Sequence, residues 1–312
     1  MSDVAIHTVP AMGTVVTVQV VGHGETAERR ALRDEAMRRA TDWFRMVEVT
    51  CSRFDPRSEL RTLCTTVETP VPLSSVLFEL LVFAVAVARE SGGAFDPTVG
   101  GAMEARGFTR HFRTGAEHPS GVAATGPTFE DISVDRANRT ATLHRALMLD
   151  LGGVAKGFAA DLAARELAEF GDFAIDAGGD QFLSGRNATG DLWSVGIRHP
   201  RKRDDVVEVL QITDVAICTS GDYERVSSTG AGGHHLIDPR GGSRTAEVAS
   251  ATVIAPTAMA ADALATAAFV LGPERGTPFL ERQGASGVWY DATLQRHATT
   301  NFASMIDARV AR

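Results

Sequence analysis

The feature that most constrains this fold is the irregular order in which helix-like and strand-like segments follow one another. Apolar residues at helical spacing predict helices over 26–50, 74–89, 154–170 and 259–271. Short runs rich in β-branched residues lie between them and predict strands at 15–21, 132–135, 140–151, 173–175, 192–197, 206–212, 248–254, 287–291 and 294–299. Because strands and helices do not alternate one by one, we expect an α+β protein with mixed, largely antiparallel sheets and packed helices, rather than a doubly wound parallel sheet.

The length of the chain bears on its domain organisation. A chain of 312 residues can bury a substantial core as one unit, and no internal repeat divides it. Its 44% of hydrophobic and 22% of charged residues exclude wholesale disorder. We expect a single domain over 1–312, with two closely packed subdomains as the alternative. Scattered Gly, His, Arg and Pro predict a surface loop near 105–127.

Charge and cysteine content exclude several classes of protein. A net charge of −8 argues against broad binding to nucleic acid or an anionic membrane, although it allows a local basic patch. Three cysteines without a CxxC pair argue against a disulfide framework or a zinc ribbon. The first residues lack the basic start and apolar core of a secretory signal, and the longest apolar stretch, 76–88, is too short to span a bilayer. We therefore expect a cytoplasmic protein without membrane insertion.

Two oxygen-bearing residues share one face of the last predicted helix. Asp262 and Thr266 are four residues apart in AMAADALATAAFVLG, so both project from the same side of a largely apolar helix. A carboxylate beside a hydroxyl suits a hard cation such as Mg²⁺, which prefers oxygen ligands and often shares them with phosphates. The plain alternative is an early-turn helix charge beside a satisfied hydroxyl, and the spacing alone favours it.

A glycine pair leads into the third predicted helix. In DLGGVAKGFAAD the turn begins at Asp150 and is followed by Lys156. Free backbone N–H groups and the positive end of a helix can hold an anion there. The segment is neither a Walker A loop nor GxGxxG. A tight turn with a solvated lysine is the alternative, and local sequence does not decide between them.

Several further turns carry polar side chains. In SGGAFDPTVGG, Phe95 and Asp96 could present a ring and a carboxylate to a ligand, although an ordinary turn is the simpler interpretation. The same holds for AGGD and TSGDYER. In GGHHLIDPRGG, His234 and His235 would point to opposite faces of a strand, so only one of them could serve a site as a base or a phosphate contact. No HExxH or GxSxG motif supports a zinc peptidase or an α/β-hydrolase.

Taken in order, these blocks resemble the ApbE family of flavin transferases. The ordered set is MGT, CSRFDPRSEL, GAFDPTVGG, DLGGVAKGFAAD, AGGD, WSVGIRHP, TSGDYER, HHLIDPRGG and ADALATAAFVLG, which covers most of the chain. The resemblance implies an ApbE-like, T-fold-related α+β architecture. It also implies cleavage of FAD at its pyrophosphate with Mg²⁺, transfer of FMN to a Ser or Thr hydroxyl of an acceptor protein, and release of AMP. An FAD pyrophosphatase giving FMN and AMP, or a non-catalytic flavin-binding protein, are the alternatives.

The resemblance also implies roles for individual residues. Asp262 and Thr266 fall on the family's metal-binding D-x-x-x-T pattern, and the backbone carbonyl of Gly153 falls on its third protein ligand. His235 matches a position near the reacting phosphates, as a general base or a phosphate contact. The positions that match contacts to FAD are Met12, Phe54, Ala94, Phe95, Asp96, Asp150, Lys156 and Leu236.

Three positions depart from the common family pattern. Phe54 stands where many members have Tyr, so a hydroxyl is lost while stacking on the flavin can remain. Cys64 stands where many have Asn, and Gly153 where many have Ala. The family also includes exported lipoproteins. Since this chain shows no export signal, we expect its acceptor to be modified in the cytoplasm.

Overall fold

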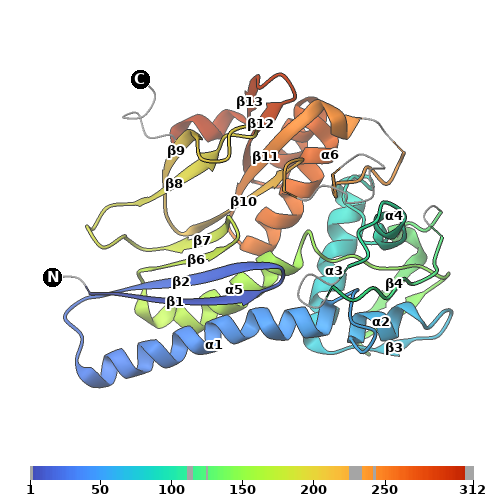
Figure 1. The fold of residues 1–312 in the computed structure, drawn as a ribbon, viewed down its shortest axis with the longest axis horizontal. Coiled ribbons are helices and arrows are strands. Elements are labelled where there is room, and N and C mark those ends of the chain that lie inside the picture. Colours follow the sequence, from blue (N-terminus) through green and yellow to red (C-terminus); the bar gives the residue numbers. More distant parts are fainter. Residues whose placement is uncertain (1–2, 111–114, 124–125, 225–233, 242–243, 306–312) are drawn as a thin grey trace.

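The computed structural model of the chain describes residues 3–110, 115–123, 126–224, 234–241 and 244–305. Its centre is an eight-stranded antiparallel sheet in the order β1-β2-β6-β7-β10-β11-β12-β13 (Figure 1). The strands are β1 (Asp3–Ala11), β2 (Thr14–Gly22), β6 (Phe173–Ala177), β7 (Asp180–Ser184), β10 (Val215–Gly221), β11 (Val248–Ala255), β12 (Ser286–Asp291) and β13 (Arg296–Ala298). Strands distant in sequence, such as β2 and β6, are therefore neighbours.

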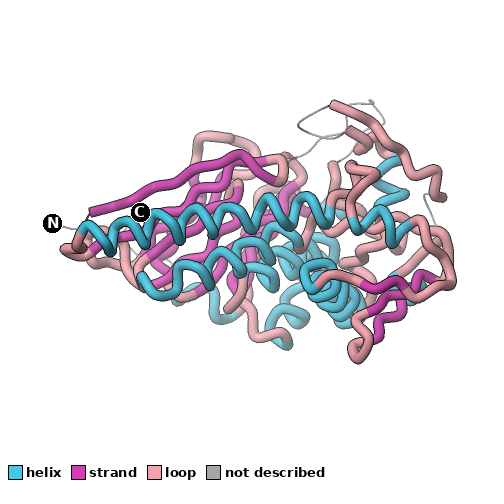
Figure 2. The backbone as a smooth tube through the Cα atoms, turned by 90° about the horizontal axis from the view of Figure 1, so that it is seen from below, coloured by secondary structure: helices cyan, strands magenta, loops and turns pink. Residues whose placement is uncertain are grey.

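Helices cover one face of this sheet. These are α1 (Ala27–Cys51), α5 (Ala155–Leu167) and α6 (Ala258–Arg282), with α1 lying along α5 (Figures 1 and 2). Side chains alternate across each strand, so in β2 the fully buried Val16, Val18 and Val20 belong to the large core shared with these helices. The opposite face carries a separate hairpin of β8 (Trp193–Arg198) and β9 (Val206–Ile212).

A smaller group of elements lies at the carboxyl end of α1 (Figure 1). It consists of α2 (Glu59–Cys64), α3 (Ser75–Glu90), α4 (Gly100–Ala105) and the sheet β3-β5-β4 (Val71–Pro72, Thr140–Leu143, Ile132–Asp135). Short 3₁₀ turns are η1 (Phe129–Asp131), η2 (Ala168–Phe170), η3 (Arg244–Glu247) and η4 (Thr300–Met305). Ser74 caps α3, and its Oγ accepts a hydrogen bond from Leu77 N at 3.3 Å.

The first turns of α5 and α6 are packed unusually closely. A Cβ atom on Gly157 would lie 2.1 Å from the carbonyl oxygen of Ala258, so only glycine fits at this crossing. Asp161, one turn further along α5, accepts hydrogen bonds from Ala258 N at 2.7 Å and Met259 N at 2.9 Å. These bonds satisfy two free N–H groups at the start of α6. Backbone contact and capping together fix the two helix starts against each other.

The predicted α+β class and all four long helices are confirmed, with one correction to a helix limit and one to a strand limit. The last helix does not end at 271. It continues to Arg282 through a break at Gly272, where φ is 70° and ψ is 173°. The second strand of the predicted hairpin ends at Leu143, not at 151, because the chain leaves the small sheet there.

Several elements escaped the sequence prediction. Strand β1 was missed because it contains Pro10 and lies at the edge of the sheet, where it pairs with β2 alone among the described strands and where many of its side chains are exposed or half-buried. Asp180 begins β7, although the Gly178-Gly179 pair before it was interpreted as a turn alone. Helices α2 and α4 have only six residues each, too few for a helical period to be visible.

The predicted surface loop is described only in part, because 111–114 and 124–125 lie outside the described residues. Within the rest of 105–127, the backbone forms one isolated bridge, between Arg110 and Glu117. The division into one domain or two subdomains stays a prediction. Every helix in the described part of the chain is too short or too polar to cross a membrane.

The close crossing of α5 and α6 gives a first prediction. Gly157→Ala forces a methyl group into a backbone carbonyl, so we expect the free energy of unfolding to fall by about 1–3 kcal/mol. Urea denaturation measures it. Gly153→Ala is the matched control, because its new Cβ would meet the Thr266 hydroxyl at 2.9 Å, a side-chain group that can move. Equal stability of the two variants would contradict the assigned role of Gly157.

Candidate functional site

A cavity of about 100 Å³ lies where the segment after α3 meets the first turns of α5 and α6 and the end of β10. Most of the residues predicted from the sequence line it: Ala94, Phe95, Asp96, Asp150, Gly153, Lys156, His235, Leu236, Asp262 and Thr266. They come from segments far apart in the chain. The fold therefore gathers the separate sequence blocks around one space.

The remaining two predicted residues, Met12 and Phe54, line a neighbouring cavity of about 330 Å³. Its exposed lining is mainly apolar, and it shares Asp150, Gly152 and Lys156 with the smaller cavity. The two cavities are thus parts of one cleft. One part is suited to a flat apolar ring system and the other to polar and charged groups.

Lys156 is the charged centre of this cleft. Its ammonium group forms ion pairs with the carboxylates of Asp180, at the start of β7, and Asp262, near the start of α6. The distance from Lys156 Nζ to Asp262 Oδ1 is 3.4 Å, and Gly157 N donates to the other Asp262 oxygen at 3.1 Å. Asp180 also accepts from Thr219 N at 3.3 Å. Each carboxylate is therefore held from two sides.

The pKa values of this cluster follow from its burial and its charges. Burial raises the pKa of Asp262 to about 6, against the opposing effect of the Lys156 ammonium group. Burial alone would lower the pKa of Lys156, but Asp180 and Asp262 outweigh it and raise that pKa above its ordinary value. The cluster thus places one ammonium group between two buried carboxyl groups.

Oxygen atoms that could bind a metal ion gather beside this cluster. Thr266 lies one turn after Asp262 on α6, and its hydroxyl is 3.3 Å from Ser220 Oγ. A Cβ atom on Gly153 would lie 2.9 Å from Thr266 Oγ1, so the backbone of Gly153 runs close to this hydroxyl. No group of three His, Cys, Asp or Glu side chains within the described residues could hold a metal. A carboxylate, a hydroxyl and a carbonyl together make a donor set that fits Mg²⁺.

A buried arginine connects the two parts of the cleft. Arg53 donates from Nε to Asp150 Oδ2 at 2.6 Å, and its guanidinium carbon lies 4.0 Å from the centre of the Phe54 ring. The other Asp150 oxygen accepts from Gly152 N at 2.8 Å. This cation–π contact can hold the Phe54 ring although the residue lacks the hydroxyl of tyrosine.

The turn after α3 is held by its own carboxylate. Asp96 Oδ1 accepts from Thr98 N at 2.9 Å and from Thr98 Oγ1 at 2.8 Å, and Oδ2 accepts from Phe129 N at 3.0 Å. Burial raises the pKa of Asp96. Its carboxylate orders the turn, while Ala94 and Phe95 contribute apolar wall to the cavity.

The adjacent histidines lie in different environments, as their spacing predicts. His235 lines the small cavity together with Leu236. The ring of His234 meets the ring of Phe269 edge-on, with 5.4 Å between centroids, and burial lowers the pKa of His234. Of the two, His235 is the histidine at the cleft.

Sequence reasoning missed three residues of the site: Arg53, Asp180 and Ser220. All three lie inside blocks that carry the family resemblance, CSRFDPRSEL, AGGD and TSGDYER. Taken alone, AGGD and TSGDYER could line a cleft but were interpreted as ordinary turns, and CSRFDPRSEL carried no prediction apart from the resemblance. The signal that could have found these residues is the family resemblance of the blocks, since the burial of residues along β7 does not alternate.

Comparisons with known proteins agree with this arrangement. Residues 12–289 match the model of the ApbE family. The "FAD:protein FMN transferase" of Salmonella typhimurium is 31% identical over 287 residues, which cover 88% of this chain and 80% of that protein. The ApbE protein of Thermotoga maritima matches with a TM-score of 0.83 and 27% identity, over 98% of this chain and 100% of that one. The flavin transferase ApbE of Vibrio cholerae matches with a TM-score of 0.82 and 25% identity, over 98% and 100%.

The buried charge cluster gives a second prediction. Lys156→Met leaves two buried carboxylates without their counter-ion, so we expect the free energy of unfolding without metal to fall by about 3–5 kcal/mol. Urea denaturation in EDTA measures it. Adding Asp180→Asn to this variant should restore part of the loss, because it removes one of the unpaired charges.

Lys202→Met serves as the control for this measurement. The Lys202 side chain is 68% exposed and lies 3.5 Å from Asp205, so its removal should leave the unfolding midpoint unchanged. If the Lys156→Met chain were as stable as the Lys202→Met chain, the charge of Lys156 would not contribute to the stability of the cluster.

Proposed function

Because the chain belongs to the ApbE family, we propose that it is an FAD:protein FMN transferase that moves FMN from FAD to a Ser or Thr hydroxyl of an acceptor protein. Mg²⁺ assists and AMP is released. The observation that carries this proposal is the position of Lys156 and the oxygen-donor set between an apolar cavity and a polar one. A dinucleotide with a flat ring at one end and a pyrophosphate in its middle matches such a cleft.

In this proposal FAD lies along the whole cleft. Met12 and Phe54 contact its flavin, while Ala94, Phe95 and Leu236 form walls of the smaller cavity. Lys156 and the positive end of α5 face the pyrophosphate, because an ammonium group and a helix dipole both favour an anion. Asp150 keeps Arg53 over Phe54, and Asp96 keeps the turn after α3 in place.

The carboxylate of Asp262, the hydroxyl of Thr266 and the carbonyl of Gly153 would hold Mg²⁺. When bound, it would neutralise charge on the phosphate oxygens and make the phosphorus easier to attack. Phosphoryl transfer needs positioning and charge neutralisation more than covalent help, so a site without a protein nucleophile is sufficient.

The proposed reaction is one displacement at phosphorus. The acceptor hydroxyl oxygen forms a bond to the phosphorus of the FMN half. The bond from this phosphorus to the bridging oxygen breaks, and AMP leaves with that oxygen. His235 is the proposed group that takes the hydroxyl proton, or else contacts a phosphate oxygen.

Two other activities remain alternatives to protein flavinylation. Water in place of the acceptor hydroxyl would make the same site an FAD pyrophosphatase that gives FMN and AMP. A protein that only binds flavin would leave FAD intact, and its binding would need no pair such as Asp262 and Thr266. The cytoplasmic location expected from the sequence stays a prediction, which fractionation of the source cells would test.

The transfer assay gives a third prediction. The chain is incubated with FAD, MgCl₂ and candidate acceptor proteins encoded beside its gene, and the products are measured by mass spectrometry. We expect an acceptor that gains the mass of FMN and an equal amount of AMP. Free FMN without an adduct would support hydrolysis, and intact FAD would support binding alone.

Asp262→Asn tests the metal site in the same assay. The substitution keeps the size of the side chain but removes the charged ligand, so we expect flavinylation to fall at least about a hundredfold. Asp172→Asn is the control, because Asp172 is a half-buried carboxyl group that accepts a hydrogen bond from Arg186 N at 2.7 Å but lies outside the cleft. Full activity of a folded Asp262→Asn chain would refute the assignment.

A further inference from the structure

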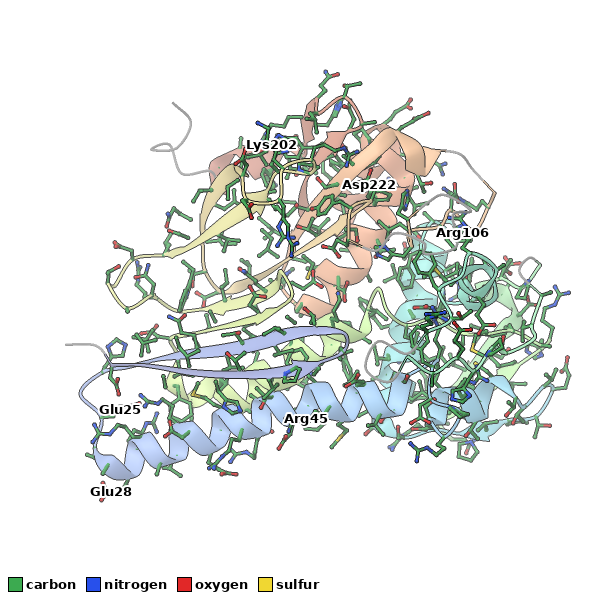
Figure 3. All side chains as sticks on the ribbon, in the orientation of Figure 1. Glu25, Glu28, Arg45, Arg106, Lys202 and Asp222 are labelled. Carbon is green, nitrogen blue, oxygen red and sulfur yellow. The ribbon has the colours of Figure 1, made fainter. Side chains whose placement is uncertain are left out.

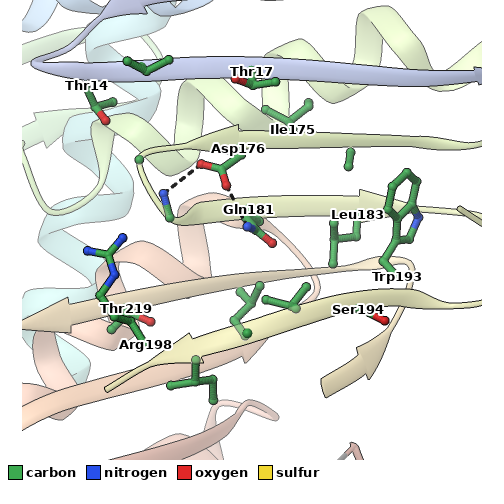
Figure 4. A pocket seen from close by; sticks show the side chains of 18 of the residues that line it. Thr14, Thr17, Ile175, Asp176, Gln181, Leu183, Trp193, Ser194, Arg198 and Thr219 are labelled. Atoms are coloured by element: carbon green, nitrogen blue, oxygen red, sulfur yellow. Dashed lines mark hydrogen bonds between the residues drawn. The ribbon is translucent and has the colours of Figure 1, made fainter. Parts of the chain in front are cut away.

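A groove runs from the proposed FAD cleft along the open side of the central sheet. It has a volume of about 670 Å³ and lies between the sheet face formed by β2, β6 and β7 and the strand β8. Figure 4 shows Trp193 at one end of this groove and Arg198 near the other, where Thr14 and Thr219 also lie. We call it the β8 groove.

The β8 groove opens into the catalytic region through a second hollow of about 500 Å³. The two spaces share Thr14, Gly178, Arg198, Tyr223 and Glu224. The second hollow also contains Lys156 and Asp180, the centre of the charge cluster. A chain lying in the β8 groove could therefore reach the proposed site of phosphoryl transfer.

Strand β8 faces this groove with its edge. All six of its residues, Trp193 to Arg198, line the groove, whereas a strand seen from its face would contribute only every second residue. Within the described part of the chain, β8 pairs with β9 alone, so its other edge offers unpaired backbone N–H and C=O groups. Such an edge is a ready template for an extended peptide.

The end of the groove near the catalytic region is basic although the whole protein is acidic. The side chains of Arg198 and Arg203 are exposed, and no hydrogen bond or ion pair links either of them to another described residue. Arg201, between them, is already held by Asp222, with contacts of 2.6 and 2.8 Å across to the loop after β10. Figure 3 labels Asp222, on the loop after β10, and Lys202, on the turn after β8.

The carboxylates that line the two spaces already have partners within the chain. Asp176 accepts from Gly179 N at 2.9 Å and from Gln181 Nε2 at 2.8 Å, as Figure 4 shows. Asp180 is paired with Lys156, and Glu224 has an interaction of its own. The guanidinium groups of Arg198 and Arg203 therefore leave this end of the groove with positive charge that no described carboxylate compensates, and a negatively charged partner would complement it.

We propose that the β8 groove binds the acceptor protein through an extended, acidic segment that adds as a strand to the free edge of β8. This inference rests on the proposed transfer of FMN to an acceptor. Arg198 and Arg203 bind carboxylates of the segment and so set its direction and register. The Ser or Thr to be modified then lies beyond Arg198, next to Lys156 and the phosphates of FAD.

Synthetic peptides test this proposal. Each peptide has ten residues, with one Thr in an Ala/Gly background. In one series a single Asp is placed at each of the other positions in turn, and in the matched series a single Lys takes its place. Peptide flavinylation is followed by mass spectrometry with FAD and MgCl₂. We expect the best Asp peptide to exceed its Lys counterpart about tenfold in kcat/KM. Arg198→Glu should reverse this preference, and Lys202→Glu, the same charge change outside the groove, should not.

Backbone pairing is tested with N-methylated versions of the best peptide. Only every second amide of an added strand points toward β8, so N-methylation should abolish flavinylation at alternate positions only. Loss that does not alternate, equal rates for the Asp and Lys series, or equal effects of Arg198→Glu and Lys202→Glu would each overturn the docking proposal. So would a dimer in light scattering that Arg198→Glu converts to a monomer, because a second copy would then occupy the edge.

Failure of docking and failure of transfer give different results. If the enzyme modifies a folded acceptor protein but none of the peptides, the acceptor is not recognised as an extended segment and the docking proposal is wrong. If it modifies neither and FAD yields only free FMN, the proposed transfer is wrong and the docking proposal falls with it.

Discussion

The contact on which the site depends is the backbone approach of α5 to α6 at Gly157. No side chain other than hydrogen fits there, since a Cβ atom would lie 2.1 Å from the carbonyl oxygen of Ala258. The same residue donates its N–H to Asp262. Close packing therefore brings Lys156, at the start of one helix, to Asp262, near the start of the other, and the charge cluster is a direct result of this helix crossing.

Successive side chains of β10 point to opposite faces of the sheet, so this strand contributes to both proposed sites. Cys218 and Ser220 point to the helix-covered side, where Ser220 contacts Thr266. Thr219 points to the opposite side and lines the β8 groove, while its backbone N–H holds Asp180. One strand thus separates the proposed nucleotide site from the proposed acceptor site, and the two meet at its end.

The sequence predicted the fold class and the long helices because their periodicity is set locally. It could not predict the order of the strands, since pairings such as β2 with β6 depend on contacts between distant segments. For the site, Asp262 and Thr266 could be proposed from helical spacing, whereas Asp150, Phe54 and Met12 came only from the family resemblance. Arg53 and Asp180 were missed because nothing in their local sequence reveals that Asp150 and Lys156 face them.

The central claim is that the oxygen atoms beside Lys156 hold a divalent cation against the phosphates of FAD. The most direct test is anomalous X-ray diffraction from crystals grown with FAD and Mn²⁺ in place of Mg²⁺. The account predicts an anomalous peak within bonding distance of the Asp262 carboxylate, the Thr266 hydroxyl and the Gly153 carbonyl, with the pyrophosphate beside it. A well-ordered FAD whose pyrophosphate lies away from Lys156, or a manganese ion bound elsewhere, would contradict it.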